Sequence, residues 1–180
     1  VVGFLSFGMP AQPLGWFKSE ITDASQLQGL KYRAVGLAAD LFQAMGCSVA
    51  QLPGGEIVPA MERGVIDGFE FNNPTSDLRF GSQDVAKNYM LSSYHQASES
   101  FEYIFNRDTF ESLDPDLQAI LQYAVEAAHL SNFALAMHQY SADLELLATE
   151  HGVNVKRTPD TVLQAQLAAW DEILPPLMED

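Results

Sequence analysis

The segment from residue 30 to residue 71 limits the fold of this chain more than any other part of the sequence. It alternates short apolar runs of strand length with amphipathic stretches of helical length. The predicted strands are 30–35, 47–52 and 65–71, and the predicted helices are 37–45 and 56–64. Gly46 and Gly64 end the two helices as C-terminal caps. Because the connections are short, this β-α-β-α-β order predicts a parallel sheet with right-handed crossovers.

The remaining sequence adds strands on both sides of this unit. Residues 1–8 read as a buried strand, and Pro10 and Pro13 place the residues that follow in a loop. Further strands are predicted at 88–94, 100–106 and 153–157, and residues 74–83 as a short helix or a loop.

The longest predicted helix lies between Asp114 and Gly152, where apolar residues recur every three or four positions. A helix of this length would run about 50 Å, which is longer than a compact small domain. We therefore expect it either to bridge two lobes or to break in the middle. A last helix is predicted from Pro159 to Ile173.

Composition excludes several classes of partner. The 180 residues are 47% hydrophobic and carry 24 acidic against 9 basic side chains, a net charge of −15. The chain can bury a full core, and its charge argues against nucleic acid and anionic membrane surfaces, which are polyanions. Cys47 is the only cysteine, so no internal disulfide and no cysteine-based zinc site can form. We expect Cys47 to be a small buried apolar residue.

Enzyme motifs are missing from the sequence. The four histidines, His95, His129, His138 and His151, form no HxxxH or HExxH pair, and there is no nucleophile elbow or P-loop. Gly54 and Gly55 precede a predicted helix and could bind an anion, but a tight turn is the favoured interpretation.

Arg33 and Glu70 are the strongest candidates for a functional site. Each falls at or near the carboxyl end of a predicted parallel strand, the edge at which open α/β sheets bind ligands. Arginine offers a rigid fork that matches two carboxylate oxygens. Glu70 stands between Phe69 and Phe71, an apolar setting in which a carboxylate needs a cation. That cation is either Arg33, which would make a structural ion pair, or a metal ion that helps to capture a small anion.

Several motifs resemble one family along essentially the whole chain. They are Gln12 with Gly15-Trp16-Phe17, Leu30-Lys31-Tyr32-Arg33 with Gly36-Leu37, the LPGGE segment at 52–56, the GVIDG segment at 64–68 leading into Glu70, and the stretch from Tyr94 to Asn106. On these residues the chain is similar to the solute-binding subunits of TRAP (tripartite ATP-independent periplasmic) transporters. Within them it most resembles the branch that binds 2-oxo acids such as pyruvate, or related hydroxy acids.

The resemblance implies a set of site residues. The ligand-binding residues it implies are Arg33, Gln12, Phe71 and Trp16, and the metal ligands are Glu70, Gln12, the carbonyl of Phe71, and Gln96. Phe71 stands where the branch has Trp, which leaves a main-chain ligand intact, and Gln96 stands where it has Glu, which removes a negative charge. With one carboxylate left, sodium is favoured over calcium as the bound cation.

The resemblance also implies a fold and partners. It predicts an α/β, periplasmic-binding-protein-like fold with a parallel-rich sheet flanked by helices and a long C-terminal helix. The chain would correspond to the C-terminal portion of such a protein, with the first lobe largely missing. Residues 1–106 would form the second lobe with its hinge strands, and residues 107–180 a helical region with one strand that packs toward the first lobe.

The function implied is non-enzymatic capture of a small carboxylate in the periplasm and its delivery to a membrane permease. We also expect a homodimer formed by the long and terminal helices, with the apolar stripe from Leu117 to Leu147 as the contact. One alternative is an α/β enzyme that uses Glu70 as general base and Arg33 as substrate clamp; it lacks a second titratable group to complete a proton transfer. Another is a receptor or scaffold of the same fold without a transport role.

Overall fold

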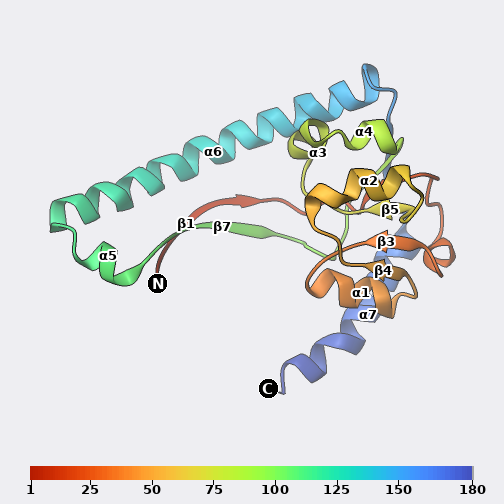
Figure 1. Cartoon of the computed structure of the whole chain (residues 1–180), viewed down its shortest axis with the longest axis horizontal. Coiled ribbons are helices and arrows are strands. Elements are labelled where there is room, and N and C mark those ends of the chain that lie inside the picture. Colours follow the sequence, from red (N-terminus) through yellow and green to blue (C-terminus); the bar gives the residue numbers. More distant parts are fainter. Residues whose placement is uncertain (180) are drawn as a thin grey trace.

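A six-stranded sheet, at the right in Figure 1, forms the core of the main body, in a computed structural model that describes residues 1–179. Its strand order is β4 (Ser48–Ala50), β3 (Lys31–Arg33), β5 (Gly68–Phe69), β2 (Gly15–Phe17), β6 (Asn88–Leu91) and β8 (Asn154–Arg157). β3 runs parallel to β4 and β5, and β6 runs parallel to β8, whereas β2 is antiparallel to both of its neighbours. The predicted parallel β-α-β-α-β unit is therefore confirmed.

Helices cover both faces of this sheet. The two crossover helices are α1 (Leu37–Ala44) and α2 (Ile57–Glu62), and the other helical elements are η1 (Ala24–Leu27), η2 (Gly54–Glu56), α3 (Pro74–Phe80), α4 (Ser82–Val85), α5 (Arg107–Glu111), α6 (Pro115–Thr149) and α7 (Asp160–Leu177). Neighbouring residues of β2 point to opposite faces, as strand geometry requires. Phe17 packs with residues of α1 and α7, and Trp16 packs with residues of α2 and the end of α6.

A two-stranded ribbon extends away from the sheet (Figure 1). β1 (Val2–Met9) and β7 (Glu99–Phe105) pair antiparallel, with a register shift between Leu5 and Gly8. Residues 1–8 are a strand as predicted, but the prediction that it is buried is wrong. Only Ser6 and Met9 are buried within β1, because a ribbon of two strands has one face covered by α6 and no second layer on the other.

The long helix α6 is a single unbroken element of 35 residues that packs along β1 and α3. Within the predicted stripe, Leu121 and Ala128 face β7, and Leu147 is fully buried in the core. Part of this stripe therefore packs on the chain's own strands, whereas Leu117 and Leu135 of the same stripe are exposed. Other apolar side chains of α6 are exposed outside the stripe, among them Ile120, Tyr123 and Leu130. No helix within residues 1–179 has the length and apolar character needed to cross a membrane.

Strand β2 was not predicted, because Pro10, Pro13 and Gly15 around it are typical of a loop. The side chain of Trp16 explains why this segment is nonetheless fixed in the middle of the sheet. Its indole Nε1–H donates to Asp77 Oδ2 over 2.9 Å, and its ring stacks on Tyr89, whose hydroxyl donates to the same oxygen over 3.0 Å. Asp77 is almost fully buried, and this burial raises the pKa of its carboxyl to about 7 against the opposing effect of the hydrogen bonds.

Gly15 is required where β2 meets β5. It has a φ of +124°, and a Cβ added there would lie 2.1 Å from the carbonyl oxygen of Phe69. We expect Gly15→Ala to lower the free energy of unfolding by at least about 2–3 kcal/mol, since backbone strain adds to a clash with the main chain of β5. Urea unfolding measures this change.

Gly29 provides the matched control for this substitution. It also has a positive φ, of +71°, but no atom lies within 4 Å of the added Cβ. Gly29→Ala should cost about 1 kcal/mol, the conformational penalty alone. Equal losses for the two variants would contradict the close approach of β2 to β5.

Candidate functional site

Arg33 ends β3, and its side chain is held by the strands on both sides. Its Nε donates to the carbonyl oxygen of Leu52, just beyond β4, over 2.9 Å. Its Nη1 donates to the carbonyl oxygen of Glu70, just beyond β5, also over 2.9 Å. Because β3 lies between β4 and β5, the guanidinium is fixed to main-chain atoms of both neighbours at the carboxyl edge of the sheet.

Glu70 pairs directly with this guanidinium. Its Oε1 accepts a hydrogen bond from Arg33 Nη1 over 2.6 Å, and its Oε2 accepts one from Gln12 Nε2 over 2.5 Å. All three side chains are buried, with exposed fractions of 6% for Arg33, 4% for Glu70 and 3% for Gln12. The sequence placed these residues far apart in the chain, and the structure brings them together in one buried polar cluster.

The electrostatic balance of Glu70 reflects opposing effects. Burial raises the pKa of its carboxyl above the ordinary value, while the charge of Arg33 and the amide of Gln12 act in the opposite direction. Arg33 and Gln12 therefore favour the ionised form of Glu70, against the effect of its burial. The Nη2 group of Arg33 makes no hydrogen bond to any residue between 1 and 179, so part of the fork remains available to a ligand.

Gln96 and Phe71 adjoin this cluster. The backbone N–H of Gln12 donates to the carbonyl oxygen of Gln96 over 3.0 Å, which holds the half-buried Gln96 beside Gln12. Phe71 follows Glu70 in the chain, and its half-buried ring stacks on Phe80 with centroids 4.3 Å apart. The main chain of Phe71 is thus next to the carboxylate, while its ring packs away against α3.

Trp16 lies on β2, directly opposite Phe69, the residue before Glu70. Its side chain is fully buried, and its one polar group is bonded to Asp77. Its place in the ligand site stays a prediction. Two other expectations are met: Cys47 is buried, which raises its thiol pKa to about 12, and Gly54–Glu56 forms a short 3₁₀ turn before α2.

The donor atoms in the cluster suit a hard cation. They are the carboxylate of Glu70 and the amide or main-chain oxygens of Gln12, Phe71 and Gln96, with no thiolate or imidazole among them. Between residues 1 and 179 no group of three or more His, Cys, Asp and Glu side chains is placed to hold a metal ion. A cation at this edge would therefore be held by one carboxylate and neutral oxygens.

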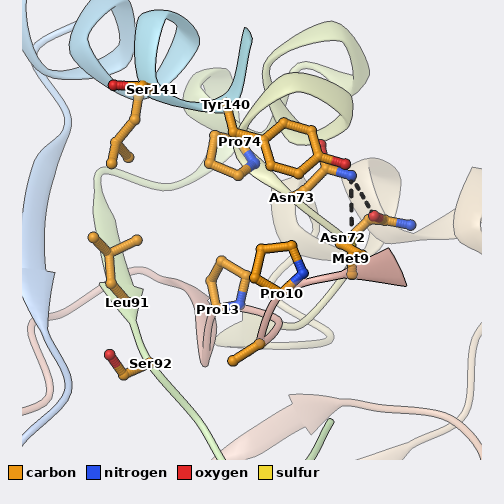
Figure 2. Close-up of a pocket in the computed structure, with 12 residues that line it drawn as sticks. Met9, Pro10, Pro13, Asn72, Asn73, Pro74, Leu91, Ser92, Tyr140 and Ser141 are labelled. Carbon is orange, nitrogen blue, oxygen red and sulfur yellow. Dashed lines mark hydrogen bonds between the residues drawn. The ribbon is translucent and has the colours of Figure 1, made fainter. Parts of the chain in front are cut away.

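A cavity of about 400 Å³ has residues from both sides of Gln12 in its lining (Figure 2). Its other walls come from the end of β1, residues 72–74 after Glu70, the end of β6 with Ser92, and the last third of α6. Neither Arg33 nor Glu70 lines it, and its lining has no charged side chain. We therefore identify the charged cluster, and not this cavity, as the candidate site for a carboxylate.

Two contacts that fix this site could not be predicted from sequence patterns. The carbonyl of Leu52 orients Arg33, and the carbonyl of Gln96 holds the backbone of Gln12. Both are main-chain acceptors, which residue type does not reveal. The LPGGE turn that carries Leu52 is the one signal that could have pointed to the first.

Comparison with known proteins shows which protein family this chain resembles. Residues 10–180 of this chain match the family model DctP, which is described as bacterial extracellular solute-binding protein, family 7. The monocarboxylate 2-oxoacid-binding periplasmic protein of Nostoc sp. is 33% identical over 142 residues, which are 79% of this chain and 38% of that protein.

Solved structures of TRAP periplasmic solute-binding proteins are similar over 99% of this chain. A Colwellia psychrerythraea protein with bound calcium and pyruvate has a TM-score of 0.87 and 32% identity, and this chain covers 55% of it. A Pseudoalteromonas atlantica protein with bound sodium and pyruvate has a TM-score of 0.86 and 30% identity, with 54% covered. A Bordetella bronchiseptica protein, a dimer with calcium and picolinate, has a TM-score of 0.89 and 27% identity, with 53% covered.

These matches confirm the predicted fold class and the resemblance. The chain has the mixed α/β architecture of these periplasmic binding proteins and spans about half the length of the solved structures. The family match extends over nearly all of the sequence. The chain belongs to the DctP family of bacterial extracellular solute-binding proteins, the solute-binding proteins of TRAP transporters.

Proposed function

We propose that this chain provides the carboxylate-binding part of a periplasmic receptor for a small 2-oxo or 2-hydroxy acid. The observation that carries the proposal is the buried cluster of Arg33, Glu70 and Gln12 at the carboxyl edge of the sheet. Two relatives of at least 30% identity are described with bound pyruvate and a cation, which supports the same ligand class here.

Binding would proceed by exchange of partners. The acid's carboxylate would pair with Arg33, whose Nη2 is free, and a calcium or sodium ion would pair with Glu70. The side-chain oxygen of Gln12 and the main chain of Phe71 would complete the cation's ligands, with Gln96 beside them. When bound, the cation supplies positive charge that attracts the acid's remaining oxygens. No buried charge is then left without an opposite partner.

A receptor fits this cluster better than an enzyme does. The carboxylate oxygens of Glu70 are bonded to a guanidinium and an amide, and neither group exchanges protons near neutral pH. A general base would need a further titratable group to complete the transfer. We therefore infer binding without chemistry, in the periplasm, followed by delivery to the membrane subunits of a TRAP transporter.

The role of Arg33 can be tested with pyruvate. Arg33→Lys keeps the charge but loses the fork and the paired contacts to Leu52 and Glu70. We expect the affinity of the complete protein for pyruvate to fall about 10- to 100-fold, the loss of one to two charge-assisted hydrogen bonds. Isothermal calorimetry measures this affinity. The control is Arg63→Lys, because Arg63 is an exposed arginine after α2. Unchanged affinity for every small acid tried would refute the clamp.

The cation can be tested through Glu70. Glu70→Gln removes the one carboxylate of the proposed ligand set, so calcium should no longer strengthen pyruvate binding. Calorimetry with and without added calcium, and again with sodium, measures the dependence. Glu56→Gln, an exposed glutamate in the LPGGE turn, should keep it. If Glu70→Gln responds to both cations as the unchanged protein does, the ion binds elsewhere.

The expected homodimer can be tested on α6. Leu130, with an exposed fraction of 74%, and its neighbours Ile120 and Tyr123 form an apolar surface on the side of the helix away from the ribbon. We expect light scattering of the complete protein at micromolar concentration to give the mass of a dimer and Leu130→Glu to shift it toward the monomer. A monomeric mass for the unchanged protein would contradict the prediction.

A further inference from the structure

The loop between β6 and β7 reaches the candidate site but has no regular structure of its own. It contains Gln96, whose carbonyl oxygen accepts the backbone N–H of Gln12. It begins at Ser92, which has a φ of +73° and is the one non-glycine residue with positive φ among residues 1–179. A segment in such a conformation has to be held by contacts from outside the loop.

Gln166 of α7 makes those contacts. Its side chain has an exposed fraction of 0% and lies between the turns of α7 that carry the buried apolar residues Val162 and Ala169. Its Oε1 accepts the backbone N–H of Tyr94 over 2.8 Å, and its Nε2 donates to the hydroxyl oxygen of Ser93 over 2.7 Å. An amide buried on an apolar helix face is costly unless it is hydrogen-bonded, and an aliphatic side chain would fill the same space without these bonds.

Two further contacts complete the attachment. The indole Nε1–H of Trp170, one turn along α7, donates to the carbonyl oxygen of Tyr94 over 2.8 Å. The hydroxyl oxygen of Ser93 already accepts from Gln166 and from the backbone N–H of His95, so it donates its own proton to His95 Nδ1, 2.6 Å away. This assigns the remaining ring proton to Nε2 of His95, a buried atom without a partner in the described chain.

Hydrogen bonds and a short stretch of the chain therefore join α7 to the charged cluster. This connection runs from Gln166 to residues 93–94, along the chain to Gln96, from there to Gln12, and then to Glu70 and Arg33. Gln12 lies in a segment with two prolines and no strand partner, so its bond to Gln96 is a main restraint on its backbone. Movement of the loop would displace Gln12 from Glu70.

We propose that Gln166 is a positioning residue of this site: by fixing residues 93–94 to α7, it keeps Gln12 and Gln96 in place beside Glu70. Its effect on ligand binding rests on the function proposed above. Its effect on the backbone does not, because the amide protons of Tyr94 and Gln12 report on the attachment without any ligand.

The test compares Gln166→Leu with Gln164→Leu in the complete protein. Both substitutions replace glutamine by leucine on α7, but Gln164 is exposed. Amide hydrogen exchange should become about tenfold faster at Tyr94 and Gln12 in Gln166→Leu, with no change at the amides of β3 and β4. Gln164→Leu should leave all of these rates unchanged. Nitrogen NMR should also show His95 mainly protonated at Nε2 in the unchanged protein and in Gln164→Leu. In Gln166→Leu this tautomer should no longer be the main one.

Trp170→Phe provides a second, milder variant that keeps an aromatic ring and removes one bond to Tyr94. It should accelerate exchange at Tyr94 by a smaller factor. With pyruvate and calcium, Gln166→Leu should bind about tenfold more weakly than the unchanged protein. Unchanged exchange at Gln12, or equal acceleration at every core amide, would overturn the positioning role. If Arg33→Lys leaves acid binding intact while Gln12 exchange responds to Gln166→Leu, the proposed clamp is wrong and the positioning role stands.

Discussion

The ion pair between Arg33 and Glu70 is the interaction around which this half of the molecule is organised. Both charges are buried, and taking two ions out of water costs several kcal/mol for each unless hydrogen bonds replace the lost hydration. Those bonds come from every neighbouring segment: the turn after β4, the main chain after β5, the loop around Gln12 and, through it, Gln96. Each of these segments is irregular, and each is held in place by its contact with the pair.

The net charge of the chain and the local charges at the candidate site have opposite effects on an anion. A protein with a charge of −15 repels anions at long range, yet the cluster contains an arginine and suits a cation. At physiological ionic strength, exposed charges are screened beyond about 8 Å, whereas buried pairs are screened much less. In the proposed receptor, recognition of an acid would therefore depend on a few buried groups and not on the net charge.

Sequence patterns predicted the regular helices and strands because hydrophobic periodicity and helix-capping residues determine these elements locally. The units 30–35 to 65–71 matched their strands and helices, and Arg33 and Glu70 appeared at the ends of neighbouring parallel strands as expected. Prediction from sequence patterns failed where contacts between distant segments determine the local structure. Gly15–Phe17 becomes a central strand only because β5 and β6 pair with it, and the ribbon strand β1 looks apolar although one side has no cover. The bond of Trp16 to Asp77, a partner 61 positions away, was likewise not predictable from local pattern.

Helix α6 has a mechanical consequence. Its last turns are anchored in the core through Leu147, whereas its first turns lie on the ribbon well away from the sheet (Figure 1). The helix has 35 residues and is about 50 Å long. If it rotates as a rigid rod by about 5° at its anchored end, its other end is displaced by about 4 Å. The register shift in β1 gives the ribbon a point at which it can bend with the rod. A small rotation at the anchored end can thus become a movement of several ångströms at the far end of the arm.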